Sequence, residues 1–410
     1  MNVPRDSVGE PPAARLQAGF AFIFATVLLD MLSIGIVVPV LPKLVVDFMG
    51  GDTREAAEIF GLFGTAWALA QFVFSPVQGA LSDAFGRRTV ILISNFGVGL
   101  DYVLMALAPN IAWLFVGRVI SGVTAASISA AYAYVADVTP PEQRAARFGF
   151  LGAAFGAGFI FGPALGGLAG SISPRLPFWI AAGLSLANAC YGLLVLPESL
   201  PRTRRTAFSW RRANPLGALA LLRSHAELFG LACINFLSNL AHAVLPSVGV
   251  LYMLYRYGWD ERTIGLTLAG VGAASIVVQA GIVGRVVKLI GERAALMVGI
   301  VFGVIGFLVF ALAWTSVVFW LGIPLLALWG LEEPASQALM SRRVSAAEQG
   351  RLQGANASIM GIANLFGPGL FTQIFALAIA GERGIPGAPF LLAGVLLVAA
   401  AAVAWRTTRR

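Results

Sequence analysis

The chain has 410 residues, of which 58% are hydrophobic and only 12% are charged. Because soluble domains carry about 25% charged residues, this composition excludes an ordinary soluble protein and indicates a chain that crosses a membrane many times. The net charge of +8 would suit a nucleic-acid binder. The arginines, however, lie in loops between apolar segments, where a membrane topology needs them, so we expect no nucleic-acid partner.

Hydropathy predicts twelve membrane-spanning helices. Continuous apolar runs of this length fit helices, because barrel strands would be shorter and alternating. No cleavable signal peptide is expected, because residues 1–15 are polar and the first apolar run is long enough to span. The predicted spans are residues 17–42, 57–81, 88–108, 111–135, 147–170, 177–197, 227–255, 262–286, 292–314, 316–340, 353–380 and 387–405.

The distribution of lysine and arginine predicts the orientation. Of the 28 such residues, 21 fall on the side that holds the N-terminus and 6 on the other, with Arg118 inside a span. The positive-inside rule then predicts a multi-pass protein of the cytoplasmic membrane with both termini in the cytoplasm. The longest polar interruption, residues 198–224, is expected to be a cytoplasmic linker between an N-terminal six-helix bundle (residues 1–197) and a C-terminal one (residues 225–410).

A charged, glycine-bracketed loop joins the second and third spans, and a weaker copy of it recurs in the second half. Gly79-Ala-Leu-Ser-Asp-Ala-Phe-Gly-Arg-Arg88 and Gly284-Arg-Val-Val-Lys-Leu-Ile-Gly-Glu-Arg293 are 205 residues apart. Gly162-Pro163 returns with the same offset as Gly367-Pro368. We therefore predict an all-α membrane protein of two duplicated six-helix bundles, with a cavity between them near the membrane midplane.

The loop from residue 79 to residue 88, called the signature loop below, suits a gate. Its glycines allow close helix approach and positive φ, and its charges can form a cluster that holds the cytoplasmic ends of the two halves together. The alternative is an ordinary positive-inside loop. The candidate gating residues are Gly79, Asp83, Gly86, Arg87 and Arg88. This sequence resembles the signature loop of the major facilitator superfamily, although Ala84 stands where that family usually has a basic residue, which implies a looser gate.

A glycine-rich stretch in the fifth span is similar to the motif of the antiporter branch of that superfamily. Its glycines would let a neighbouring helix approach closely and its proline would bend the span, which could restrict leak across the cavity. Ordinary small-residue helix packing is the alternative. The residues of the motif are Gly158, Gly162, Pro163, Gly166 and Gly167.

Several further segments resemble drug/proton antiporters of the tetracycline-efflux type. They are Asp30–Pro42, Gly99–Tyr102, Gly117–Gly122, Leu196–Ser199 and Gly265–Ala269. The resemblance implies proton-coupled export of an amphipathic, drug-like compound, with Asp30, Asp101 and Arg118 in proton coupling. Each is an ionisable residue within a span, which by itself marks a candidate functional site. Arg118 is a plausible counter-charge to Asp30, and for Asp101 a structural ion pair inside the first half is the alternative.

The second half departs from the tetracycline exporters. Ser275 stands where they have a histidine in the eighth span, and Gly303 where they have an aspartate in the ninth. These departures place tetracycline itself in question or move the chemistry elsewhere. Because adjacent side chains on a helix point about 100° apart, only one of the two neighbouring glutamates of the tenth span is expected to face the cavity. The substrate-binding candidates are Gln71, Asn239, His242, Gln279, Glu332 and Glu333.

Other chemistries find no support in the sequence. There is no phosphate-binding loop, no nucleophile–base motif and no Cys/His metal cluster, and Cys190 and Cys233 lie inside apolar runs. We therefore expect no ATP use, no cofactor, no metal and no enzymatic activity. The expected partners are a small-molecule substrate, protons and the lipid bilayer, with the protein a monomer. The alternatives are a proton-coupled transporter of a small metabolite on the same fold and a non-transporting membrane receptor or scaffold.

Overall fold

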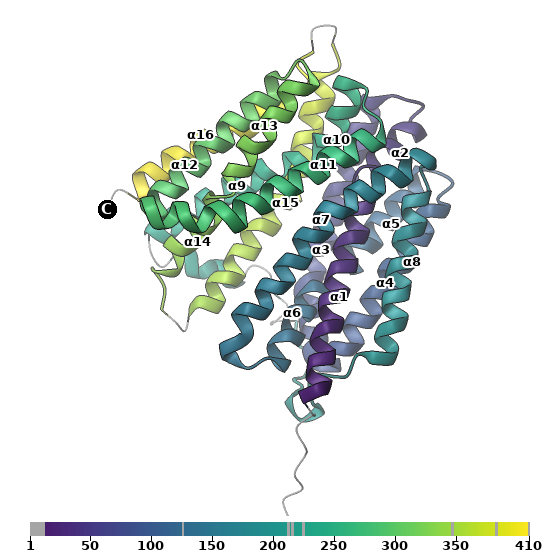
Figure 1. Cartoon of the computed structure of the whole chain (residues 1–410), viewed down its shortest axis with the longest axis vertical. Helices are drawn as coiled ribbons and strands as arrows, with labels where there is room; N and C mark the ends of the chain where they lie inside the picture. The colour runs from purple at the N-terminus through teal and green to yellow at the C-terminus, as the bar shows by residue number, and fades with distance from the viewer. Residues whose placement is uncertain are drawn as a thin grey trace, which may run out of the picture.

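The structure is a computed structural model that describes residues 13–124, 127–210, 214, 217–223, 226–345, 348–381 and 384–408. Every regular element within these ranges is a helix (Figure 1). The first half holds α1 (Ala13–Val37), α2 (Leu41–Phe48), α3 (Thr53–Phe85), α4 (Arg87–Leu107), α5 (Ile111–Thr124), α6 (Ser127–Val138), α7 (Pro141–Ile172) and α8 (Leu176–Val195). The linker holds the short 3₁₀ helices η1 (Arg202–Arg204) and η2 (Gly217–Arg223). The second half holds α9 (Ala226–His242), α10 (Val244–Tyr257), α11 (Glu261–Ile276), the π-helical η3 (Val277–Val283), α12 (Gly284–Leu312), α13 (Ser316–Trp329), α14 (Glu332–Ser341), α15 (Gln349–Ala378) and α16 (Ala388–Thr407).

Eleven helical stretches of the described chain are long and apolar enough to cross a membrane. One of them, Glu261–Leu312, has 52 residues. At 1.5 Å per residue it is about 78 Å long, more than twice the roughly 30 Å hydrocarbon core. Its path breaks at Gly291, where φ is 77° and ψ is 164°. The predicted eighth and ninth spans are the two arms of this stretch, and the all-helical, twelve-span fold is confirmed.

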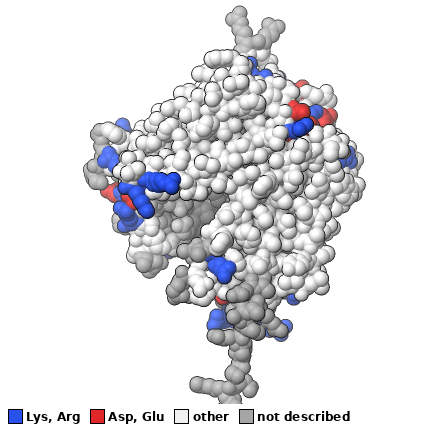
Figure 2. Space-filling view, viewed as in Figure 1, with Lys and Arg blue, Asp and Glu red and all other residues white. Residues whose placement is uncertain are grey.

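The outer surface suits a lipid environment. Large apolar side chains such as Leu194, Ile172 and Leu289 are 87%, 79% and 83% exposed. Charged side chains in Figure 2 gather in a few clusters and leave wide areas of the visible face uncharged. A hydrophobic exterior of this extent fits acyl chains rather than water.

The helix breaks repeat at the spacing of the sequence repeat. α1 ends at Val37 and α9 ends at His242, 205 positions later. Gly86 and Gly291 have the same spacing, and both have positive φ, +104° and +77°. Such backbone conformations are open almost only to glycine, so the recurrence of glycine in the two loops has the same physical cause in both halves.

Packing within each half brings sequence-distant helices together. In the first half α1 lies against α7 and α8, and α4 against α8; in the second half α12 lies against α13 and α16, and α9 against α16. Figure 1 shows the first half in purple to teal and the second in green to yellow. Between the halves, α3 runs along α15 and α7 runs along α11.

Small residues allow these two contacts between the halves. Gly64 lies against the ring of Pro368, where a Cβ would come within 2.6 Å of the proline Cβ, and Gly61 lies against Thr372. Gly167 of α7 faces Gly265 of α11, where a Cβ on Gly167 would come within 3.0 Å of the Gly265 Cα. These contacts gather toward the side where α3 begins at Thr53 and α11 begins at Glu261, which we call the closed end.

Two aspartates cap the helices that begin at the closed end. Asp52 accepts hydrogen bonds from the backbone N–H groups of Arg54 (2.8 Å) and Glu55 (3.1 Å). Asp260 accepts one from the Thr263 N–H at 2.9 Å. Hydrogen bonding from the Thr263 side chain, and next from this N–H, holds the pKa of the Asp260 carboxyl below its ordinary value. Caps of this kind satisfy backbone N–H groups that have no partner within the helix.

The opposite end, which carries Gly86, is called the signature-loop end. Ion pairs between described residues at this end stay within one half or within the linker. The linker folds back onto the loop, since the Thr206 N–H donates to the Asp83 carbonyl at 3.1 Å. Arg211 and Arg212, two of the linker cations counted from the sequence, lie outside the described residues.

Candidate functional site

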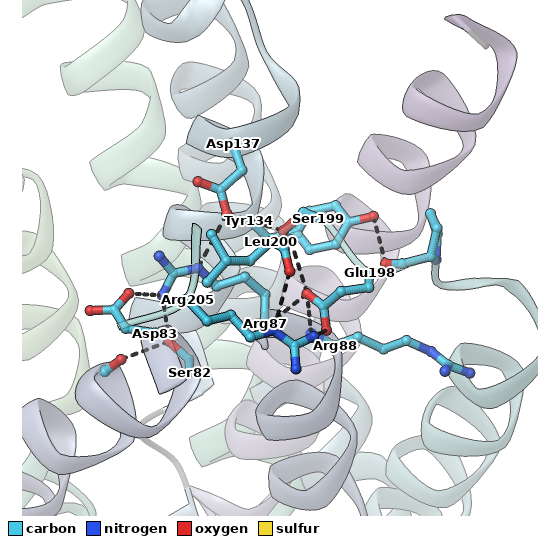
Figure 3. Close-up of polar contacts among 12 residues, drawn as sticks. Ser82, Asp83, Arg87, Arg88, Tyr134, Asp137, Glu198, Ser199, Leu200 and Arg205 are labelled. Atoms are coloured by element: carbon cyan, nitrogen blue, oxygen red, sulfur yellow. Dashed lines mark hydrogen bonds and ion pairs between the residues drawn. The ribbon is translucent and has the colours of Figure 1, made fainter. Parts of the chain in front are cut away.

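The signature loop turns on Gly86, the residue between α3 and α4. Its φ of +104° directs the chain so that the Arg87 N–H donates to Glu198 Oε1 at 2.9 Å. A Cβ on Gly86 would collide with the Glu198 carboxylate and come within 2.7 Å of an Arg205 guanidinium nitrogen. Arg205 pairs with Glu198 at 3.4 Å, and the Leu200 N–H donates to the same carboxylate at 3.1 Å. Glu198 therefore anchors the loop to the start of the linker (Figure 3).

The Arg87 side chain is the centre of the loop's polar network. Its guanidinium pairs with Asp83 at 2.6 Å and with Asp137 Oδ2 of α6 at 3.2 Å, and it donates to Ser82 Oγ at 2.6 Å (Figure 3). Arg88 points elsewhere and donates to the Leu193 carbonyl of α8 at 2.7 Å. The network thus ties α3, α4, α6 and α8 together. Its described partners all belong to the first half or the linker, so a link from this loop to the second half stays a prediction.

The second half builds the corresponding ion pair with the charges exchanged. Glu292 and Arg342 form an ion pair, and they lie 205 positions after Arg87 and Asp137 respectively. Lys288 likewise stands at the position equivalent to Asp83. The repeat has therefore kept the cross-link between the two equivalent helices of each half but inverted its polarity.

The glycines of the antiporter-like motif form the contact between α7 and α1. Gly158 lies over Met31 and Gly162 over Gly35, where added Cβ atoms would come within 2.5 Å of the Met31 Cβ and 2.6 Å of the Gly35 Cα. Gly166 lies against the backbone of Ile36. The neighbouring Gly167 faces α11 instead, and the Pro163 carbonyl of α7 also faces α11. One helix thus contacts α1, which carries Asp30, on one side and the second half on the other.

Four ionisable side chains gather inside the first half. Asp101 of α4 is 1% exposed, and neither of its oxygens has a hydrogen-bond partner. Arg118 of α5 interacts electrostatically with Asp101 and with Tyr102, and its guanidinium carbon lies 5.4 Å from the Trp67 ring centroid. Tyr102 also lies in the field of Asp30, whose Oδ1 is buried without a partner.

For Arg118 the sequence offered Asp30 as the charge partner, and for Asp101 it kept a structural ion pair inside the first half as the alternative. The structure places Asp101 beside α5, the helix that carries Arg118: an added Cβ on the neighbouring Gly117 would come within 2.9 Å of Asp101 Oδ1. Tyr102 interacts electrostatically with Asp101, Arg118 and Asp30. Its role was not predicted, although its place directly after a buried acid in the segment Gly99–Tyr102 could have pointed to it.

A cavity of about 560 Å³ lies in the second half. Its inner wall contains Phe310, Phe319 and Phe390, which are at most 3% exposed. Its outer wall contains Glu333 and Gln353, which are exposed and lie toward the signature-loop end. Five of the six predicted substrate-binding residues border it: Asn239, His242, Gln279, Glu332 and Glu333. Gln71 does not; it lies on α3 of the first half.

Both glutamates of α14 line this cavity, whereas the sequence suggested only one. Glu332 is 5% exposed, and its Oε1 has no hydrogen-bond partner. Glu333 is exposed and accepts a hydrogen bond from Gln337 at 3.3 Å. Both acids belong to the first turn of α14, about 100° apart around its axis. The cavity is wide enough to be bordered by the buried Glu332 and by the exposed Glu333.

Ser275 and Gly303, the two positions at which the sequence departs from the tetracycline exporters, lie in different surroundings. Ser275 lines the cavity and donates to the Val271 carbonyl at 2.9 Å. Gly303 is buried, and a Cβ there would come within 2.9 Å of the Trp329 indole. Gly299, one helical turn away, packs against the Glu332 backbone N. The tryptophan thus fills the space beside position 303, and an acid from α14 lies one turn away on the same helix face.

The model of one protein family matches residues 23–368, most of the chain, and its description is the Major Facilitator Superfamily. The chain belongs to the major facilitator superfamily. The resemblance inferred from the signature loop is thereby confirmed. The fold, with its internal repeat and its two sets of helices, is the fold of this superfamily.

Curated relatives within the superfamily are named for tetracycline resistance. This major facilitator chain is 37% identical to the class C tetracycline resistance protein of Escherichia coli over 366 residues, covering 88% of this chain and 91% of the relative. Among solved structures, it superposes on the nucleoside transporter NupG with a TM-score of 0.74 at 14% identity, covering 95% and 99% of the two chains. It superposes on the human organic anion transporter MFSD10 with a TM-score of 0.69 at 24% identity, covering 96% and 100%. At these identities the solved structures show the shared fold alone.

Proposed function

We propose that this protein exports an amphipathic, drug-like compound from the cytoplasm in exchange for protons, by alternating access. The observation that carries the proposal is the group of ionisable side chains inside the first half, where Asp30 and Asp101 have buried oxygens without hydrogen-bond partners. An acid without a fixed partner is energetically costly inside the membrane. Its presence there therefore indicates a function, such as binding and releasing a proton. The names of the tetracycline-resistance relatives support drug export.

The proposed proton path uses the first half and the proposed substrate path the second. Protonation of Asp101 would remove the negative charge that faces Arg118, and Tyr102 lies in the field of both this pair and Asp30. A proton bound by either acid would thus change the electrostatic balance within α1, α4 and α5. Coupling requires that this change favours one arrangement of the two halves over the other.

The two ends of the molecule support alternating access. The halves meet through glycines at the closed end, while the ion pairs described at the signature-loop end do not join them. With both termini in the cytoplasm, as the lysine and arginine distribution predicts, this conformation faces inward. Closing the other end would bring the signature loop toward the second half, where its charges could form the predicted gate.

Asp30→Asn in proteoliposomes is the direct test of the proton path. We expect the variant to lose substrate movement driven by a proton gradient, because an amide cannot bind and release a proton, while downhill substrate movement persists. The matched control is Asp47→Asn, since Asp47 is an exposed acid of α2 whose ion-pair partner among the described residues is the neighbouring Lys43. Full gradient-driven transport by Asp30→Asn would remove Asp30 from the mechanism.

A further inference from the structure

The polar side chains around the second-half cavity share an unusual property. Described buried side-chain N or O atoms of the second half without a hydrogen-bond partner belong to four residues, and all four residues border this cavity. They are Ser238, Trp329, Glu332 and Asn356, and the Ser238 hydroxyl lies beside the Glu332 carboxylate, where it can partner one carboxylate oxygen. Buried polar groups in native proteins are nearly always paired, so a cluster of unpaired ones around one cavity indicates a missing partner.

The charge of this cavity defines the chemistry of the partner. Glu332 and Glu333 border it, and none of the described lining residues is a lysine or arginine. His242 is the other titratable side chain of the wall, and its ring lies 5.7 Å from that of Trp329. A carboxylate as buried as Glu332 needs a cation beside it to remain charged within the membrane. The wall does not supply one.

The shape and composition of the wall define the rest of the ligand. The cavity volume of about 560 Å³ falls in the range of sites for drug-sized molecules. Trp329 and three phenylalanines provide flat apolar surfaces, and aromatic faces attract organic cations as well as apolar rings. The indole N–H of Trp329 and the amide NH₂ group of Asn356 have no hydrogen-bond partner and can donate to a polar edge of such a molecule.

We infer that this cavity binds a flat organic cation, with Glu332 as the counter-charge that selects it and Glu333 at the entrance. The inference rests on the proposed function, because it names the substrate class of that transporter. The position of the carboxylate is particular to this chain. Position 303 of α12 is a glycine with the Trp329 indole beside it, and the acid that borders the cavity comes from α14 instead. Glu332 thus recognises the substrate, while Asp30 and Asp101 serve the proton.

The test is equilibrium binding of ethidium, a flat organic cation, to the purified protein in detergent, with uncharged phenanthridine as the matched ring system. We expect the wild type to bind ethidium at least about tenfold more tightly than phenanthridine, since losing a desolvated charge partner has effects of this order. Glu332→Gln should lose most of this preference and leave phenanthridine binding unchanged. Glu333→Gln should lose only a small part of it, because that side chain is exposed. Glu58→Gln changes a partly exposed acid of α3 that lies outside the cavity wall; it is the control and should bind as the wild type does.

Each result decides the inference. Equal binding of the two ligands by the wild type, or no ethidium binding, would overturn it. So would an unchanged preference in Glu332→Gln; loss of proton-driven transport in that variant would then assign Glu332 to the proton instead. If Glu332→Gln does not fold, Glu332→Asp keeps the charge and should keep the preference for ethidium. The binding assay needs no proton gradient, so transport of tetracycline without ethidium binding would refute this inference and leave the proposed function intact.

Discussion

The backbone of the signature loop allows a prediction with internal controls, because three glycines differ in one property at a time. Gly86 has positive φ and lies against Glu198, Gly291 has positive φ with nothing within 4 Å of an added Cβ, and Gly79 lies in a helix with the same open space. Alanine at each position therefore separates backbone strain from lost contacts.

The expected magnitudes follow from these environments. Forcing a side chain into the extended region at positive φ costs roughly 1–3 kcal/mol, so Gly291→Ala should lower the free energy of unfolding by about that amount. Gly86→Ala should lose about 2 kcal/mol more, because the Cβ displaces Glu198 from its charge-assisted hydrogen bonds, with partial exposure reducing their value. Gly79→Ala should be neutral or stabilising by up to about 1 kcal/mol, since alanine favours the helix.

The assay is reversible unfolding in mixed micelles with increasing sodium dodecyl sulfate. A double-mutant cycle of Gly86→Ala with Glu198→Gln should be strongly non-additive, because both changes remove the same contact. The anchoring role of Glu198 is refuted if Gly86→Ala and Gly291→Ala destabilise equally. The role of backbone strain is refuted if Gly291→Ala behaves like Gly79→Ala.

Three further outcomes can be checked on the same purified protein. Arg87→Asp should destabilise the first half, and adding Asp137→Arg should restore much of the loss, because the second half already uses that polarity; unfolding measurements that show no rescue would contradict this. Gly166→Ala should lower the free energy of unfolding by about 1–3 kcal/mol, because its Cβ would meet the α1 backbone. Gly183→Ala in α8 is the control, since its Cβ would meet nothing within 4 Å. Equal melting temperatures for the two variants would contradict the close packing of α7 on α1. Gly303→Asp should express poorly and melt early, because the carboxylate would enter the space of the α13 tryptophan; a stable variant with tetracycline transport would show that the site can repack.

Much of the architecture could be predicted from the sequence, because a membrane leaves few alternatives. Apolar length, loop charge and the 205-residue repeat sufficed for the helical spans. The structure adds that Gly86 and Gly291 both have positive φ. The presence of a glycine in the sequence does not by itself establish that backbone conformation. The exact partner of Arg118 could not be predicted, because it depends on how α4 and α5 rotate against α1.

The cavity was harder to predict than the spans. Glu332 and Glu333 were singled out because acids are rare inside spans, and their separation of about 100° on a helix suggested that only one would face a cavity. The cavity borders both side chains of the first turn of α14, and its width depends on how several helices pack, which hydropathy does not report. The packing of Trp329 beside Gly303 depends on how two helices pack against each other, and the sequence carries no local signal for it.

The most direct measurement of the central claim is tetracycline accumulation by inside-out membrane vesicles under an imposed proton gradient, repeated with ethidium and an uncharged drug. We expect that at least one compound accumulates only while the gradient lasts, that its addition releases protons from the vesicle interior, and that Asp30→Asn abolishes both effects. Accumulation that persists after the gradient is collapsed, or the absence of transport of all three compounds, would contradict proton-coupled drug export.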